Sequence, residues 1–468
     1  MAVQRIADLM EDYALERVPA SERKGWLTMS WNTTGLVTTL VMLYLGSLVC
    51  FVAGVKIALM AGITALVIGS ALAWGIAGIA YNTGCSGTVL TRQFSLGVRG
   101  SALASVIFGT MIISFLAIEN ALLYRGVLLF FEAQDTIMLR MLIYSVFTIT
   151  WILLTAFGFE LVTRASSVMV VSFLLLLAWI VIDIVTQSGR EIGEAVLFPT
   201  QLPEIALTGL GIHTPLDKYA FAFNILIAPA GTLALNNADF GRYGRSTFDV
   251  GIAATLGILL STCVVMLLGG VLMYAAAGTV TEYFIGRGLN AETAQARVLQ
   301  SPDSIAATFM VFSGALGFIL MFLAQAKAQV LNTYSSSLSL TNLCDALFGW
   351  RPGRFVFVVL ANVIALVMLY GDILEYVEEW FTLLGVFMTC LVGVIILDYY
   401  VISARLRRSE SEPELVNYAG VVTVVASTVM AHYVLEDIIT IECITSLAGA
   451  IILYPLLRLT LLRPRLSI

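Results

Sequence analysis

Long apolar runs separated by short polar stretches recur from one end of the chain to the other. A helix that crosses a bilayer needs about 20 predominantly apolar residues, and many segments meet this requirement. The pattern therefore predicts an all-α polytopic membrane protein with about twelve transmembrane helices. In chain order, spans 1 to 12 lie near residues 29–54, 57–80, 100–130, 136–158, 164–186, 218–237, 248–278, 305–336, 355–372, 376–402, 417–435 and 438–460.

Two of these spans contain helix breakers or small polar residues near their middle. In span 1, Gly35 is surrounded by threonines, and in span 6 Pro229 and Gly231 stand close together. Transporters break paired helices in this way to expose backbone groups to substrate and ions. The separation of five spans predicts two inverted repeats, spans 1–5 and 6–10, with broken helices 1 and 6 and two further helices. The alternative is that Gly and Pro are simply common in membrane helices.

Composition supports a membrane protein and argues against other classes. Hydrophobic residues make up 59% of the chain, charged residues 12%, and the mean hydropathy is +0.94, whereas a soluble domain has about 25% charged residues. Six scattered cysteines form no CxxC pair, and His213 and His432 are the only histidines. We therefore expect no metal and no cofactor. Without HExxH, GxSxG or a nucleotide-binding loop we expect no enzyme. Without charge rings a channel is disfavoured, and no domain could hold nucleic acid.

Basic residues indicate the orientation in the membrane. With twelve spans and a cytoplasmic N-terminus, seventeen Lys and Arg residues lie on the cytoplasmic side and seven on the other, with Lys327 on neither. Cytoplasmic loops carry such an excess, so we expect a multi-pass protein of the plasma (inner) membrane with both termini cytoplasmic. We divide the chain into an N-terminal tail (1–28), a ten-helix transport core (29–402), a cytoplasmic loop (403–416) and two extra helices with a short tail (417–468). No cleavable signal peptide is expected.

Four stretches resemble the nucleobase–cation symporter family, the permeases for cytosine, purines, uracil, thiamine, allantoin and related heterocycles. They are RVPASERKGWL at 17–27, FSLGVRGSALAS at 94–105, GTLALNNADFGRYGRS at 231–246 and GVIILDYYVISARLRR at 393–408. The resemblance covers nearly the whole chain in order and spacing. It implies a LeuT-type fold that works by alternating access, with substrate and sodium sites between spans 1, 3, 6 and 8.

The resemblance also exposes a departure at the sodium site. It assigns sodium ligands to Gly35 and Thr38, mainly as carbonyls, and to span 8 positions that commonly hold Ser or Thr. Here those positions are Lys327 and Ala328, and a third is Ala324. Lysine at the centre of a membrane helix costs about 2.5–3.5 kcal/mol on insertion scales. Our hypothesis is that the ammonium occupies the sodium position, donating to carbonyls near Gly35 and to groups such as the Thr38 hydroxyl.

A fixed cation at this position would remove the need for sodium. Because burial also disfavours the charged form of lysine, Lys327 could release its proton during the cycle. The alternatives are snorkelling to the surface or a static pair with a buried acid.

For the substrate, the resemblance gives Phe115 a stacking role and Glu119, one turn later, a polar role. An ionised carboxylate only accepts hydrogen bonds, so Glu119 suits a ligand rich in N–H donors or a cationic amine. The alternative is that Glu119 is the partner of Lys327 or a proton carrier.

Further substrate positions follow from the same alignment. Gln329 takes the place of a substrate-binding Asn, with Thr333 one turn away. The alternative for both is a hydrogen bond between helices. Thr39 and Ala230 stand where the family has aromatic residues, so a two-sided stack on a flat ligand is in doubt.

Charges near the cytoplasmic end of span 6 complete the set of candidate residues. Asp239, Arg242 and Arg245 are interpreted as a salt-bridged cap or, alternatively, as an inner gate. Asn236 and Asn237 are interpreted as structural or gate residues.

The function expected is secondary active import of a small nitrogen-rich, nucleobase-like heterocycle, coupled to protons rather than sodium or independent of sodium. The alternative is an amine or amino-acid transporter on the same fold.

Overall fold

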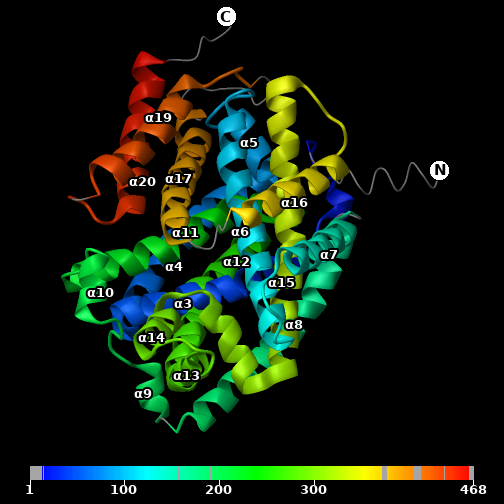
Figure 1. Ribbon diagram of the computed structural model, residues 1–468. Helices are drawn as coiled ribbons and strands as arrows, with labels where there is room; N and C mark the ends of the chain where they lie inside the picture. The colour runs from blue at the N-terminus through cyan, green and yellow to red at the C-terminus, as the bar shows by residue number, and fades with distance from the viewer. Residues whose placement is uncertain are drawn as a thin grey trace, which may run out of the picture.

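The computed structural model describes residues 13, 15–156, 159–189, 191–371, 377–403, 413–436 and 438–462 (Figure 1). Within these residues every regular element is a helix, apart from one isolated parallel bridge. In the part of the chain that the structure describes, nine helices are long and apolar enough to cross a membrane, one bent pair qualifies together, and two shorter apolar helices accompany them. In chain order they match the twelve spans predicted from the sequence.

The spans are α2 (Trp26–Val37) with α3 (Leu40–Ala53), α4 (Val55–Thr83), α6 (Ser101–Phe130), α7 (Ile137–Thr155), α8 (Phe159–Gln187), α11 (Pro215–Gly241), α12 (Thr247–Leu259) with η2 (Leu260–Val265) and α13 (Met266–Gly286), α15 (Asp303–Phe348), α16 (Arg354–Tyr370), α17 (Val377–Leu397) with η4 (Asp398–Ser403), α19 (Tyr418–Val429) with η5 (Met430–Val434), and α20 (Glu442–Leu456) with η6 (Leu457–Leu461).

Short helices precede or connect these spans. They are η1 (Ala20–Glu22), α5 (Gly87–Gln93), α9 (Ile192–Val196), α10 (Glu204–Gly209) and α14 (Ala291–Gln300). Within the bundle, α15 packs mainly along α6, and α11 packs mainly along α4. Figure 1 shows α19 and α20 at one flank of the bundle, where both contact α17. The last two spans are thus peripheral.

The expected break in span 1 is confirmed. Helices α2 and α3 meet at an angle of 64°. Thr38 has φ −96° and ψ 59°, outside the helical region, and extended Thr39 caps α3 by accepting a hydrogen bond from the Met42 N–H at 3.4 Å. Because the helix stops here, carbonyls at the end of α2 are left for other partners.

The expected break in span 6 is wrong. Helix α11 runs from Pro215 to Gly241 without interruption, and Pro229 lies inside it. A membrane helix tolerates an internal proline when its neighbours compensate for the lost hydrogen bond. Gly231 serves packing instead, because a Cβ atom at this position would lie 3.0 Å from the Thr389 hydroxyl of α17. The small residue lets the two helices approach closely.

Two of the stretches that carry the family resemblance contact one another. The Lys24 N–H donates to the Tyr243 carbonyl at 2.5 Å, and the Arg245 N–H donates to the Lys24 carbonyl at 3.0 Å. Helix α2 begins at Trp26, two residues after Lys24, and α11 ends at Gly241, two residues before Tyr243. The start of span 1 is therefore joined by backbone hydrogen bonds to the end of span 6.

Candidate substrate and ion site

Lys327 lies at the break in span 1 and is fully buried. Its ammonium donates to the Gly35 carbonyl at 3.4 Å, to the Ala324 carbonyl at 3.1 Å, and to the Thr38 carbonyl. An ammonium has three donors, so these three acceptors match its capacity. The Thr38 hydroxyl is used differently from our expectation, because it donates to the Thr34 carbonyl at 2.7 Å.

The surroundings of the ammonium favour a cation. The end of α2 presents carbonyl oxygens that carry the negative end of the helix dipole. The ring of Phe173, from α8, lies with its centroid 4.3 Å from Nζ, within the range of a cation–π interaction. Phe173 was not identified from the sequence, since an aromatic residue in an apolar span carries no signal by itself.

Glu119 is the second buried charge near this break, with 1% of its surface exposed. Asn332 Nδ2 donates to its carboxylate at 3.3 Å, and the Thr39 side chain forms a hydrogen bond with it. Glu119 and Lys327 interact electrostatically, but no ion pair within 4.0 Å joins them among the described residues. Lys327 contacts Thr38 and Glu119 contacts Thr39, so both charges lie next to the break in span 1.

A cavity lies directly beside these residues. Its free volume, counted together with the open solvent at its mouth, is about 330 Å³. It is bounded by spans 1, 3, 6 and 8. The lining residues are Leu36, Val37, Met42, Ile112, Phe115, Pro229, Thr232, Leu233, Asn236 and Asn332.

Phe115 therefore lines the cavity, as a stacking residue must, whereas Ala230 does not. Ala230 faces α4, where a Cβ atom added to Gly69 would lie 2.7 Å from the Ala230 Cβ. The neighbouring Pro229 lines the cavity instead. The assignment of Ala230 to the substrate is thus at odds with its position.

Two span 8 side chains that we expected to contact the substrate, Gln329 and Thr333, form other contacts. Gln329 Nε2 donates to the Leu116 carbonyl of α6 at 2.8 Å, and the Thr333 hydroxyl accepts from Asn362 of α16 at 3.4 Å. Both form hydrogen bonds between helices, which was the alternative reading, and neither lines the cavity. The span 8 amide that lines the cavity is that of Asn332, one turn after Gln329.

Asn236 is the other cavity amide that we had not assigned to substrate. Its Oδ1 accepts a hydrogen bond from the Ser335 hydroxyl at 2.7 Å, which fixes the orientation of the side chain between α11 and α15.

A buried arginine follows the end of α11 and contacts the N-terminal segment. Arg242 is completely buried, and its guanidinium donates to the Tyr334 hydroxyl at 2.8 Å and to the Tyr13 carbonyl at 2.5 Å. Asp239 caps the start of α5 by accepting from the Gly87 N–H at 2.8 Å. These contacts hold α11, α15, α5 and the N-terminal segment together.

Comparison with known proteins places this geometry in a family. A family model described as "Permease for cytosine/purines, uracil, thiamine, allantoin" matches residues 18–438. No curated protein shows a significant match to the sequence.

Solved transporters share the fold at low identity. The inward-facing conformation of Mhp1 is 14% identical, covers 94% of this chain and 91% of its own, and has a TM-score of 0.70. A closed form of Mhp1, described as a nucleobase-cation-symport-1 family transporter with bromovinylhydantoin bound, is 14% identical over 96% and 93% of the two chains, with a TM-score of 0.69. A Na⁺-coupled sialic acid symporter is 15% identical over 97% and 93%, with a TM-score of 0.58.

These likenesses confirm the LeuT-type fold predicted from the sequence. The family match spans the region from the N-terminal segment through span 11, including every residue of the cavity. The chain belongs to the family of permeases for cytosine and purines, uracil, thiamine and allantoin, and is a membrane transporter.

Proposed function

We propose that this transporter imports a small nitrogen-rich, nucleobase-like heterocycle without a requirement for sodium, with the ammonium of Lys327 acting in place of the sodium ion. The observation that carries the proposal is the set of ammonium contacts. Gly35, Thr38 and Ala324 are three positions that the family resemblance associates with sodium, and the carbonyls of these residues accept hydrogen bonds from Lys327. While Lys327 is protonated, its ammonium would leave no room there for a sodium ion.

The proposal for the substrate depends on the cavity. Phe115 supplies an aromatic face, and Asn236 and Asn332 supply amides that can both donate and accept. Glu119 lies behind Asn332 and accepts a hydrogen bond from it. If the Asn332 side chain changes its rotamer, Glu119 would accept a hydrogen bond from the substrate directly. Otherwise Glu119 would orient the Asn332 amide, which contacts the substrate. A planar ring with several N–H donors suits this set.

The second candidate is an amine or amino-acid carrier. It is favoured by the buried Glu119 carboxylate next to a small cavity, since a buried anion attracts a cationic ligand. A related fold occurs in a structure described as MhsT in complex with L-phenylalanine, with a TM-score of 0.57.

Coupling and orientation complete the proposal. We propose that protons drive import, with Lys327 or Glu119 as the group that exchanges the proton. The excess of basic residues on one side supports a protein of the inner membrane with cytoplasmic termini.

Thermal stability of the purified protein tests both the substrate and the ion. A ligand that binds only the native state raises the melting temperature by mass action. The panel contains nucleobases, allantoin, thiamine precursors and amines, each in sodium-containing and sodium-free buffer. The proposal is supported if a nucleobase raises the melting temperature by the same amount in both buffers. Stabilisation that requires sodium refutes the role of Lys327, and stabilisation by amines alone supports the second candidate.

A further inference from the structure

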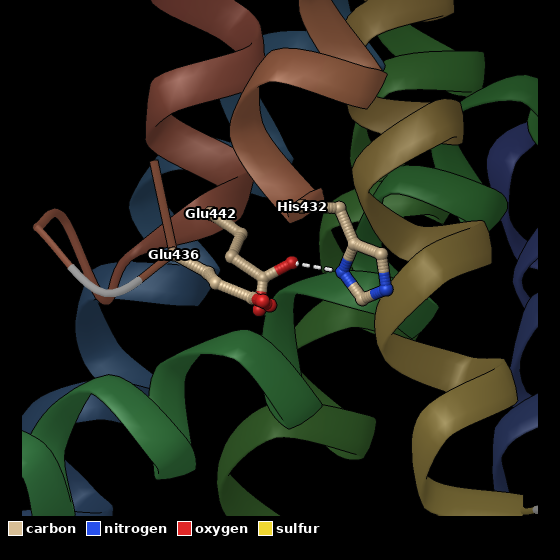
Figure 2. A group of neighbouring side chains, drawn as sticks. All are labelled: His432, Glu436 and Glu442. Carbon is tan, nitrogen blue, oxygen red and sulfur yellow. Dashed lines mark hydrogen bonds and ion pairs between the residues drawn. The ribbon is translucent and has the colours of Figure 1, made fainter. Parts of the chain in front are cut away.

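Three side chains with metal-binding groups converge in the loop that joins the last two spans. His432 lies in η5, Glu436 follows it, and Glu442 begins α20. One ligand atom from each lies within 4.8 Å of the other two. Figure 2 shows the imidazole and both carboxylate groups pointing toward the same point, with a hydrogen bond of 2.5 Å between His432 Nδ1 and the Glu442 carboxylate.

The charges of this group favour a cation. Two carboxylates that approach one another repel, and the repulsion is reduced when a positive charge lies between them. Glu442 is largely buried, with 9% of its surface exposed, whereas Glu436 is exposed. One ligand is therefore held firmly by the protein, and the exposed one gives an ion access from solvent.

The His432–Glu442 pair requires only a small adjustment. Two ligands of a tetrahedral zinc ion lie about 3.3 Å apart, given bonds of about 2.0–2.1 Å. The His432–Glu442 separation of 2.5 Å is that of a hydrogen bond, so the two groups would part by less than 1 Å to admit an ion. The ion would then replace the shared proton as the link between them.

We propose that His432, Glu436 and Glu442 form a binding site for a divalent transition-metal ion, of which zinc fits the donor set best. Imidazole and carboxylate together suit zinc, whereas magnesium and calcium prefer oxygen ligands alone. Three protein ligands leave one position for water. Sequence reasoning excluded a metal because the histidines form no spacing motif, and only the turn between spans 11 and 12 brings Glu442 beside His432.

The site is connected to the transport core through its loop. The Thr440 carbonyl, two residues before Glu442, accepts a hydrogen bond from Asn224 Nδ2 of α11 at 2.7 Å. Helix α11 carries Pro229, Thr232 and Asn236 of the cavity lining. A bound ion would fix the position of the loop, and with it one anchor of a helix that lines the cavity.

Zinc binding to the purified full-length protein tests this proposal. After treatment with a chelator and its removal, zinc is titrated against a competing indicator dye, and bound metal is counted by elemental analysis. We expect one zinc ion per chain, with a higher melting temperature than in chelator. His432→Ala and Glu442→Gln should each abolish stoichiometric binding and the melting shift.

The only other histidine supplies the matched control. His213 is exposed and lies outside the cluster, so His213→Ala should bind zinc as the wild type does. Each variant is checked for a single symmetrical peak in size-exclusion chromatography, so that loss of binding is not confused with misfolding. Absence of binding to the wild type at micromolar zinc would overturn the proposal, as would binding that survives His432→Ala or is lost in His213→Ala.

Discussion

Converting Lys327 and Ala328 together to serine should turn a sodium-independent transporter into a sodium-dependent one. The change removes the ammonium and adds two hydroxyls at the positions where the family resemblance places sodium ligands. The carbonyls of Gly35 and Thr38 keep their places at the end of α2. The vacated volume would then be lined by carbonyl and hydroxyl oxygens, which is the environment that hard cations prefer.

The magnitude follows from the hydrogen bonds that are lost. Two span 1 carbonyls lose a buried donor, at a cost of about 1–3 kcal/mol each, so the variant should be less stable by about 2–6 kcal/mol in sodium-free buffer. Sodium at a hundred times its dissociation constant would restore about 2.7 kcal/mol. That free energy corresponds to a rise in melting temperature of a few degrees.

The assay compares uptake and melting temperature in sodium chloride and in choline chloride. Wild type should show no difference, whereas the double variant should gain both stability and uptake from sodium. Lys56→Ala, which removes an exposed lysine, serves as the control and should behave as wild type. The reasoning is refuted if wild type already requires sodium, or if the double variant transports and melts like wild type without it.

Three further predictions concern the cavity and the periphery. Glu119→Gln should weaken the binding of an N–H-rich substrate by about 10- to 100-fold, since hydrogen bonds to charged groups contribute about 1.5–3 kcal/mol. Competition binding measures this affinity, and an unchanged affinity would show that Glu119 does not recognise the substrate. Phe115→Ala should weaken the binding of a flat ligand by about tenfold or more, because stacking is lost. In the same assay, Phe115→Tyr should bind the ligand nearly as tightly as wild type. A hydrogen bond from Arg140, at 2.6 Å, holds the pKa of Asp135 below its usual range. Asp135 therefore stabilises the fold above its unfolded pKa, and this contribution is lost as the pH falls through its lower folded pKa. The melting temperature of wild type should fall more steeply than that of Asp135→Asn when the pH is lowered from 7 to 3, and parallel curves would contradict this.

The sequence was informative about the spans because membrane helices must satisfy their own backbone and therefore show as long apolar runs. The contact of Lys327 with span 1 was predicted from the family resemblance, which places sodium ligands of spans 1 and 8 at one site. The sequence was less reliable for side-chain directions. One residue turns a helical side chain by about 100°, so the assignment of Ala230 instead of Pro229 moved the expected contact from the cavity to α4.

Gln329 and Asn332 show the same limit within span 8. Both carry amides, and only the packing of α15 against α6 decides which of them reaches the cavity. The break expected in span 6 failed for a different reason. A proline removes one hydrogen bond, but α11 is buried along its length by neighbouring helices, which hold it as one helix.

The pairing of Lys24 with Tyr243 and Arg245 has a mechanical consequence for the transport cycle. It ties the first helix of one repeat to the corresponding helix of the other at the end where α2 begins and α11 ends. Two helices held together at one end can tilt relative to each other, but they cannot slide along each other. As long as the pairing holds, access to the cavity would change by tilting of these two helices together.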